Sequence, residues 1–466
     1  MFVRLFWGLK KVFLVKERLK NGSNFGNINP ANSNQNLDIQ NQKRKNTKIK
    51  LGIITNTYTP DKNGISRAVS AMEKELELLG AEVYLIVPRT KGVYYPNNIL
   101  ALDGANLPKS VSDDLKLLNY NKKEIVRFFS GKQVNVVHTH DTLFGGIEGS
   151  DIAKSLGVPC VHTFHTMIED YDYAPFIGYR KLMRRLIKEV CNSYDAVICP
   201  SNKSITYLKS LKIKTNLYQI FNVVYLKTQK LTLTPEISQK YEYLRDDSKF
   251  TFIVFCRLDS YKNIDTTIEY LESILSSNPG TRLIIAGGGP ERSELEDLVV
   301  ELGLNNSVTF TGTYNPLELK AIVEHSKPDL FIFTSTSDNL PTNVLEAVSF
   351  SIPVISIDRI ATDYIVKENE NGYFFGTKEE FVRLCQNLVN NPNELKKLKD
   401  NCQRIYDQFC EGDYAQQHIN LYRFLIDRQL ASDDFSNKNK ITKVISKNFK
   451  KTLDKIKEGV DEVIGS

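Results

Sequence analysis

The sequence predicts an α/β protein with two doubly wound domains, each built on a parallel sheet. Short and almost continuously apolar strands alternate with helical segments along most of the chain, which is typical of parallel sheets covered by helices on both faces. The alternation starts near residue 50 and starts afresh after about residue 222, so we expect two sheets. The 466 residues, 41% of them hydrophobic, suffice for more than one core.

The first predicted domain covers residues 49–222. It opens with a βαβ unit, in which the strand 50–55 leads through the loop TYTPDKNGIS into a helix ending at Gly80 and then a strand at 81–88. Further strands are expected at 134–140, 158–165 and 194–201.

The second predicted domain covers residues 223–430. Its strands are expected at 250–258, 281–290, 307–312, 329–335 and 352–358. Ligands of such sheets bind beyond the carboxyl ends of the strands, so the loops there should carry the functional side chains. Arg257 ends the first of these strands, and the glycines 287–289 end the second.

Basic amphipathic extensions are expected at both ends of the chain. The whole chain has a net charge of +6, but residues 1–50 carry eleven Lys or Arg and two acidic residues, so the body is slightly acidic. Residues 1–20 are predicted to form a helix on an anionic membrane or against another protein, because charges interrupt any spanning stretch. Residues 21–48 are predicted to be a disordered linker, and residues 431–466 a basic helix that contacts a membrane or faces solvent.

Composition excludes several classes of protein. The seven cysteines are odd in number and lack CxxC spacing, so a disulfide framework and a zinc ribbon are not expected, and a reducing cytosol fits best. The acidic body does not indicate a nucleic-acid partner. No uninterrupted apolar stretch with a cleavage site resembles a signal peptide.

Seven motifs occur in an order that resembles the retaining family 4 glycosyltransferases, over about residues 50–425. They are TYTPDKNGIS, VVHTH, HTFHTMIEDYDY, CRLDSYKN, IIAGGGPE, FTGTYN and STSDNLPTNVLEAVSFSIPVIS. The third motif is most similar to the bacterial 1,2-diacylglycerol 3-glucosyltransferases. The resemblance implies the GT-B fold, in which two Rossmann-like domains face each other across a cleft.

The resemblance also implies an activity. A hexose, glucose, would pass from a nucleotide sugar such as UDP-glucose to a membrane lipid, diacylglycerol, with retention of configuration, on the cytoplasmic face of the cell membrane. No cofactor is then required, and a stimulatory role of Mg²⁺ is left open. Two alternatives remain: a glycolipid, wall-polymer or protein acceptor, and a non-catalytic protein that only binds nucleotide sugars.

The donor leaves as a diphosphate, which needs cations and backbone N–H groups. Arg257 offers a bidentate fork and Lys262 a point charge, and by resemblance both bind the diphosphate. Family members usually have Gly before this Arg, whereas this chain has Cys256, which puts the local backbone geometry in doubt. Surface solvation of both cations is the alternative.

Two acids spaced as in the family lie in the motif that begins at residue 335. By resemblance Glu346 binds the ribose hydroxyls, and Asp338, where the family has Glu, lies near the donor sugar. The alternatives are a helix cap for Asp338 and a surface acid for Glu346. A helix that starts near Leu340 presents N–H groups to phosphate.

The histidines at 138–165 end separate strands, and no metal site is predicted because no HExxH-type cluster is present. By resemblance His165 contacts the donor sugar and shapes the acceptor site. The donor-binding candidates are Gly64, Arg257, Lys262, Gly288, Asp338, Asn343 and Glu346; the acceptor-binding candidates are His165, Glu169 and Asp170; the catalytic candidates are His165, Arg257, Lys262 and Asp338.

A third basic amphipathic stretch follows the histidine motif at residues 179–190. Its apolar stripe is Leu182, Leu186, Ile187 and Val190, and its basic stripe is Arg180, Lys181, Arg184, Arg185 and Lys188. A lipid acceptor in an anionic leaflet would favour such a helix, since each basic residue near that surface is worth about 1 kcal/mol. The alternative is a core helix with a solvated face.

Overall fold

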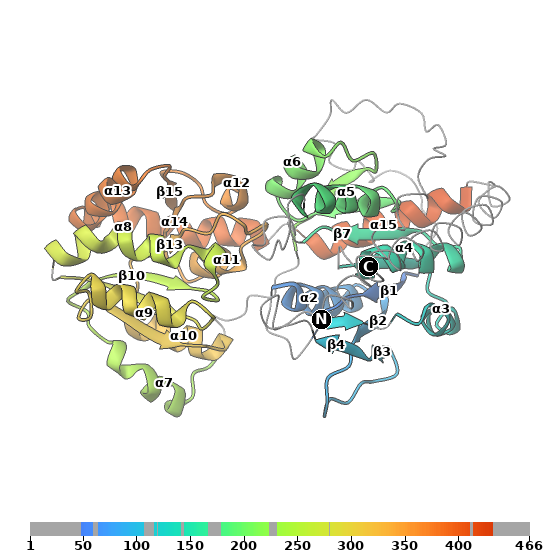
Figure 1. Cartoon of the computed structure of the whole chain (residues 1–466), viewed down its shortest axis with the longest axis horizontal. Coiled ribbons are helices and arrows are strands. Elements are labelled where there is room, and N and C mark those ends of the chain that lie inside the picture. Colours follow the sequence, from blue (N-terminus) through green and yellow to red (C-terminus); the bar gives the residue numbers. More distant parts are fainter. Residues whose placement is uncertain are drawn as a thin grey trace, which may run out of the picture. The chain divides into compact units, whose positions relative to one another are not determined.

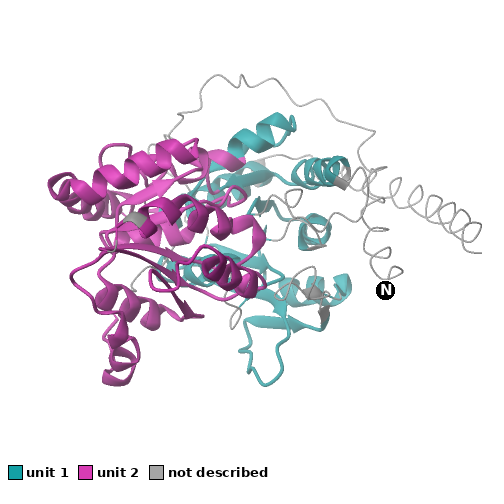
Figure 2. Cartoon of the chain, turned by 60° about the vertical axis from the view of Figure 1, so that its left-hand side comes forward, with its two compact units in different colours: residues 1–199, 205–223, 414–466 teal, residues 200–204, 224–413 magenta. Residues whose placement is uncertain are grey.

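The computed structural model describes residues 48–58, 64–106, 116–118, 120–140, 144–165, 179–222, 231–278, 280–410 and 413–431. The predicted segments 1–20, 21–48 and 431–466 therefore lie outside the described residues, apart from Lys48 and Ala431. The chain divides into two compact units (Figures 1 and 2). Unit 1 holds the described residues of Met1–Cys199, Ile205–Val223 and Tyr414–Ser466, and unit 2 those of Pro200–Ser204 and Val224–Asp413.

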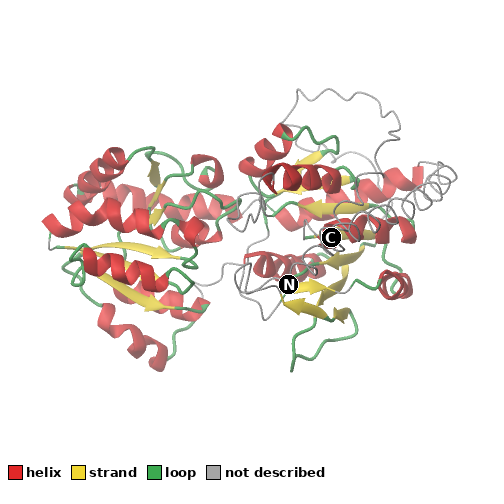
Figure 3. Ribbon diagram, in the orientation of Figure 1, coloured by secondary structure: helices red, strands yellow, loops and turns green. Residues whose placement is uncertain are grey.

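Unit 1 is built on a seven-stranded sheet in which every neighbouring pair is parallel (Figure 3). The strands, in spatial order, are β3 (Ile99–Leu102), β2 (Glu82–Pro88), β1 (Lys50–Ile54), β6 (Val136–Thr139), β7 (Cys160–Thr163), β8 (Ala196–Cys199) and β9 (Leu217–Gln219). The helices are α2 (Gly64–Leu78), α3 (Lys122–Gly131), α4 (Phe144–Leu156), α5 (Tyr179–Cys191), α6 (Asn202–Ser210) and α15 (Tyr414–Ala431). A separate antiparallel pair joins β4 (Gly104–Asn106) to β5 (Lys116–Leu118).

Both faces of this sheet are buried because side chains alternate along each strand. Leu51 and Ile53 of β1 pack in one core with α2 and α15, whereas Val137 of β6 and Cys160 of β7 pack in another core with α3 and α5. This two-sided burial explains why the strands are apolar at nearly every position.

Unit 2 repeats the architecture with a six-stranded parallel sheet. Its strands, in spatial order, are β12 (Val308–Gly312), β11 (Thr281–Ala286), β10 (Phe250–Phe255), β13 (Leu330–Phe333), β14 (Val354–Ser356) and β15 (Gly372–Phe374). Its helices are α7 (Pro235–Tyr241), η4 (Glu242–Leu244), η5 (Ser260–Lys262), α8 (Ile264–Ser277), α9 (Arg292–Glu301), α10 (Pro316–Ser326), α11 (Thr342–Ser349), α12 (Arg359–Thr362), α13 (Lys378–Asn390) and α14 (Pro392–Cys410).

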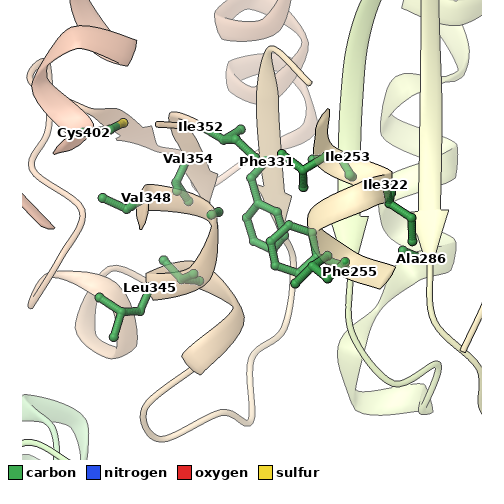
Figure 4. Packing of buried hydrophobic residues seen from close by; sticks show 14 of the residues in the cluster. Ile253, Phe255, Ala286, Ile322, Phe331, Leu345, Val348, Ile352, Val354 and Cys402 are labelled. Atoms are coloured by element: carbon green, nitrogen blue, oxygen red, sulfur yellow. The ribbon is translucent and has the colours of Figure 1, made fainter. Parts of the chain in front are cut away.

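Aromatic packing anchors the centre of the sheet of unit 2. The rings of Phe255 and Phe331, from adjacent strands β10 and β13, lie 4.6 Å apart between centroids, among side chains of α10, α11 and α14 (Figure 4). Both rings are fully buried, and each contributes roughly 1.5–3 kcal/mol by its removal from water. The loops that follow these two strands therefore start from fixed points.

The prediction of two parallel-sheet domains is confirmed, but the antiparallel pair β4–β5 was not predicted. Three short strands of the parallel sheets were also missed; β3, β9 and β15 each lie at an edge of their sheet. Strands of three or four residues are too short for the apolar pattern to stand out from the neighbouring loops.

The helix α15 departs from the predicted domain boundaries, because the sequence analysis placed residues 414–430 in the second domain. In the structure Ile419, Tyr422 and Leu425 are buried in the same core as α2 and β1, so α15 belongs to unit 1. An amphipathic helix reveals that it covers an apolar surface but not which surface it covers.

Replacing Leu425 by Ala should lower the free energy of unfolding by about 2–5 kcal/mol, because truncation of a fully buried Leu leaves a cavity. Urea denaturation followed by circular dichroism measures the change. Asp427→Asn, at a partly exposed position of the same helix, is the control and should cost less than about 0.5 kcal/mol. Equal effects of the two substitutions would contradict a core role for α15.

Candidate functional site

In unit 2, the loops after three neighbouring strands carry most of the candidate residues. Strand β10 lies between β11 and β13, all three are parallel, and their carboxyl ends meet at one edge of the sheet. Arg257 and Lys262 follow β10, Gly288 follows β11, and Asp338 follows β13. The structure therefore gathers at one edge residues that are up to 81 positions apart in the sequence.

Lys262 and Asp338 form an ion pair at this edge. The ammonium Nζ donates to both carboxylate oxygens of Asp338, at 2.8 and 2.7 Å, and the side chains are only 11% and 19% exposed. Burial opposes ionisation of both groups, but the attraction between them is larger than this effect. The attraction raises the pKa of Lys262 and lowers the pKa of Asp338. Both groups are charged at neutral pH.

The loop that carries Lys262 is bonded to the loop after β13. Asn263, in the left-handed conformation with φ 50°, donates from Nδ2 to the carbonyl of Thr334 at 3.0 Å. The hydroxyl of Thr334 donates to the carbonyl of Lys262 at 3.0 Å. These bonds hold the Lys262–Asp338 pair in register.

Arg257 also has a carboxylate partner. Its Nε and Nη2 donate to the two oxygens of Asp259 at 3.0 and 3.1 Å, while 45% of the Arg257 side chain is exposed. The guanidinium is thus oriented by a fork-to-fork contact two residues along the chain. Two cations at one sheet edge, Arg257 half-exposed and Lys262 largely buried, suit a doubly anionic group such as a diphosphate.

The three glycines after β11 allow a close approach to the Arg257 loop. A Cβ on Gly287, whose φ is 154°, would lie 1.9 Å from the carbonyl oxygen of Cys256, and a Cβ on Gly289 would lie 2.3 Å from that of Leu258. A Cβ on Gly288 would lie 2.6 Å from the Thr313 methyl group. The turn therefore packs backbone against backbone, which only glycine permits.

Cys256 does not distort the loop, contrary to the doubt raised by the sequence. Its backbone N–H donates to the carbonyl oxygen of Ala286 at 3.0 Å, which continues the pairing of β10 with β11. The backbone of Cys256 does not have a positive φ, so no glycine is needed at that position.

The helix α11 places Asn343 and Glu346 behind the same edge. Asn343 donates from Nδ2 to the carbonyl of Phe255, the last residue of β10, at 3.2 Å. Glu346 is buried, with 5% of its surface exposed, so it is not a solvated surface acid. Pro341 is the N-cap residue of α11 and Asp338 pairs with Lys262, so Asp338 is not the cap of this helix.

In unit 1, the candidate residue His165 is partly buried and lies beside a cluster of buried imidazoles. The strands β6 and β7 pair in parallel with His138 opposite Val161 and Thr139 opposite His162, so His140 and His165, which follow these strands, are neighbours. The His140 Nδ1 and His165 Nε2 atoms are 2.8 Å apart. Four of the chain's six histidines therefore gather at one sheet edge, and His418 of α15 adds a fifth.

These histidines are neutral near pH 7. Burial lowers the pKa of His162 and His165 to about 3 and that of His418 to about 4, and it holds the pKa values of His138 and His140 well below their ordinary range. A neutral imidazole has one N–H donor and one acceptor nitrogen, so the cluster can orient hydroxyl groups.

The histidine cluster does not have the geometry of a metal centre. Within the described ranges, no three His, Cys, Asp or Glu side chains are arranged to hold an ion. His138 instead shares hydrogen bonds of 2.7 Å with the hydroxyls of Tyr422 and Thr163. Sequence reasoning missed His418 and Tyr422, because they lie more than 250 residues from the histidines at 138–165. Their spacing of four residues on one helix was the only signal.

Three candidates are less constrained. Gly64 begins α2, and an added Cβ would meet no atom within 4 Å, so its predicted closeness to a phosphate stays a prediction. Glu169 and Asp170 lie outside the described residues, and their predicted roles also stay predictions.

The helix α5 is amphipathic as predicted, but its apolar stripe packs inside unit 1. Leu186, Ile187 and Val190 are buried in the cores, together with Met183. The exposed residues on the opposite face are Arg180, Lys181, Arg184 and Arg185. This is the core helix with a solvated basic face that the sequence analysis gave as the alternative.

Two family models match the chain, one in each half. Residues 62–227 match "Glycosyltransferase Family 4", and residues 236–404 match "Glycosyl transferases group 1". The chain is 25% identical to the α-monoglucosyldiacylglycerol synthase of Acholeplasma laidlawii, over 82% of this chain and 98% of that protein. It is 24% identical to the enzyme of the same name from Streptococcus pneumoniae, over 74% of this chain and 79% of that protein.

The fold is also that of solved structures. The structure of Anabaena HepE in complex with UDP matches with a TM-score of 0.62, covering 80% of this chain and 98% of that one at 16% identity. This likeness shows the fold of the chain, two parallel-sheet domains.

Asp338→Asn should lower the free energy of unfolding by about 3 kcal/mol at pH 7, because Lys262 stays buried without its carboxylate. The native pKa of Asp338 lies below its ordinary 3.8, so the pair's stabilisation is complete above about pH 5 and is lost as the pH falls through the native value. Since the pKa of Lys262 is raised above 10.5, the stabilisation persists to at least about pH 9. Denaturation at several pH values measures the difference between wild type and variant.

The matched control for this prediction is Asp247→Asn, which breaks an exposed pair with Lys327 of 2.9 Å. It should cost no more than about 1 kcal/mol. A loss for Asp338→Asn as small as that of the control would mean that the buried pair does not stabilise unit 2.

Proposed function

Because the chain belongs to the family 4 glycosyltransferases and has their two-domain GT-B fold, we propose that it transfers glucose from UDP-glucose to diacylglycerol with retention of anomeric configuration. The observation that carries this proposal is the similarity to an α-monoglucosyldiacylglycerol synthase over 98% of that enzyme's length. Enzymes of this name act on a lipid acceptor, which agrees with the exposed basic face of α5.

Unit 2 would bind the donor. Arg257 and Lys262 would hold the diphosphate, which places opposite charge where the leaving group develops negative charge. The diphosphate would compete with Asp259 and Asp338 for these cations. Lys262 would then turn from Asp338 to a phosphate oxygen, and the released carboxylate would accept hydrogen bonds from the sugar. Glu346 would bind the ribose hydroxyls.

The proposed chemical step needs no carboxylate nucleophile. The acceptor hydroxyl oxygen forms a bond to the anomeric carbon on the face from which the diphosphate leaves. The bond from that carbon to the phosphate oxygen breaks, and the acceptor proton passes to the departing phosphate oxygen. His165, held neutral by burial, would donate or accept one hydrogen bond to a sugar or acceptor hydroxyl.

The acceptor would be reached at an anionic membrane surface on the cytoplasmic side. Among the described residues, no helix has the length and apolarity needed to cross a bilayer. The four exposed basic residues of α5 provide electrostatic attraction instead, at about 1 kcal/mol each near such a surface. We propose peripheral association that is sensitive to salt.

Purified protein should form glucosyl-diacylglycerol from UDP-glucose and vesicles that contain diacylglycerol, as detected by mass spectrometry.

Arg257→Ala and Lys262→Ala should each lower kcat/KM about 10²- to 10³-fold, because each removes a cation from the leaving group. The control is Arg404→Ala: this residue is 49% exposed and pairs with Glu370, much as Arg257 pairs with Asp259. It should change kcat/KM less than about twofold.

An acceptor and donor panel decides the finer assignment. If product forms from a glycolipid, a wall polymer or a protein but not from diacylglycerol, the acceptor is that compound and not diacylglycerol. Absence of product with every nucleotide sugar would contradict the proposed function. Near-normal turnover of Arg257→Ala would remove this residue from the diphosphate site.

Charge reversal on α5 tests the membrane proposal. The double variant Arg180→Glu, Lys181→Glu should lower partitioning onto phosphatidylglycerol-containing vesicles by at least about tenfold, since two attractive charges become repulsive. The difference should shrink at high salt. Lys396→Glu, Lys397→Glu on the exposed face of α14 changes the net charge equally and is the control for vesicle sedimentation. Equal losses in both variants would contradict a specific role of α5.

A further inference from the structure

His140 stands out in unit 1 because its two ring nitrogens are in different situations. Its Nδ1 lies 2.8 Å from Nε2 of His165, with the rings nearly parallel at 25° and 5.1 Å between centroids. Its Nε2 is buried and has no hydrogen-bond partner within the described part of the chain. None of the candidate roles discussed above uses His140.

The contact between the two histidines holds a single proton. Both rings are neutral, so one nitrogen donates and the other accepts. If His165 donated from Nε2, His140 would carry its own proton on the buried and unpartnered Nε2. If His140 donates from Nδ1, the buried Nε2 of His140 carries no proton and leaves only a lone pair without a partner. Orphaned buried N–H groups are rare, and an unsatisfied acceptor is better tolerated. The second arrangement is therefore favoured.

The favoured arrangement has a consequence for His165. Its Nε2 is occupied as an acceptor, so its proton must lie on Nδ1. The imidazole of His165 then carries one donor of fixed identity, at the nitrogen that does not face His140.

His140 is itself held in place. Its backbone N–H donates to Ile54 at 3.0 Å, and its ring lies 4.2 Å from that of His138 between centroids. His138 is fixed at both nitrogens by Tyr422 and Thr163. Contacts thus run from α15 through β6 to the His140–His165 pair.

We infer that His140 is a positioning residue that fixes the tautomer of His165, so that His165 presents an Nδ1–H donor to a hydroxyl group of the donor sugar or acceptor. The effect on transfer rests on the proposed function, whereas the effect on the tautomer does not. Without His140, the His165 ring could rotate and exchange tautomers, and its donor would be present in only a fraction of the molecules.

Nitrogen-15 NMR of the full-length protein labelled at histidine tests the tautomer without any substrate. Long-range proton–nitrogen correlations distinguish a protonated Nδ1 from a protonated Nε2, and the signals of His165 are identified by their loss in His165→Gln. We expect His165 to be protonated at Nδ1 in the wild-type protein. Protonation at Nε2, or an even mixture, would overturn the inference without the need for a His140 variant.

Two neutral amide substitutions form a matched pair. Asn places its amide N–H close to the position of Nδ1 of the histidine, and Gln places it close to Nε2. His140→Asn should keep the wild-type tautomer of His165, with kcat within about threefold. His140→Gln should give a mixture of tautomers and lower kcat about 10- to 100-fold, as is found for groups that orient a metal-bound imidazole, with the donor KM little changed.

Thermal unfolding of both variants checks that the comparison is between folded proteins. A role in stability alone would lower the unfolding temperature but leave the tautomer of folded His165 the same in both variants, and this result would overturn the inference. A shifted tautomer with unchanged kcat would overturn the catalytic part of it. If no substrate is turned over, the proposed function fails, and the NMR spectra still decide whether His140 fixes His165.

Discussion

Parallel pairing of β10 with β11 and β13 brings three separate loops to one edge of unit 2, and the candidate donor site depends on this constraint. The buried rings of Phe255 and Phe331 hold two of the strands, and the glycines after β11 let the third loop lie directly on the backbone at Cys256. In unit 1 the parallel pairing of β6 with β7 plays the same part, because it places His140 beside His165.

The cations at the unit 2 edge are both paired with carboxylates, and this governs what the site can bind. Lys262 pairs with Asp338 and Arg257 pairs with Asp259, so the four groups together are close to neutral. A buried ion pair is a weak source of stability compared with apolar packing of the same volume. The proposed diphosphate would exchange partners with Asp259 and Asp338 at these two cations.

The return of α15 to unit 1 links the end of the described chain to the histidine cluster. Its apolar face closes one side of the sheet, and its Tyr422 hydroxyl shares a hydrogen bond with the fully buried His138. The same helix therefore contributes to the core and to the polar network. A polar network of this kind is stable only when its members find partners, so it is informative that Nε2 of His140 has none within the described part of the chain.

The amino-acid sequence by itself determined the two parallel sheets and the segments that carry Arg257, Lys262, Asp338 and Glu346, because strand patterns and motifs are local features of the chain. It also determined that α5 is amphipathic. Only the tertiary structure decided that Asp338 pairs with Lys262, that the apolar stripe of α5 is core, and that α15 crosses back to bring Tyr422 to His138. The hydrogen bonds of Lys262 to Asp338 and of His138 to Tyr422 join residues 76 and 284 positions apart, and no local pattern specifies which distant surfaces will meet.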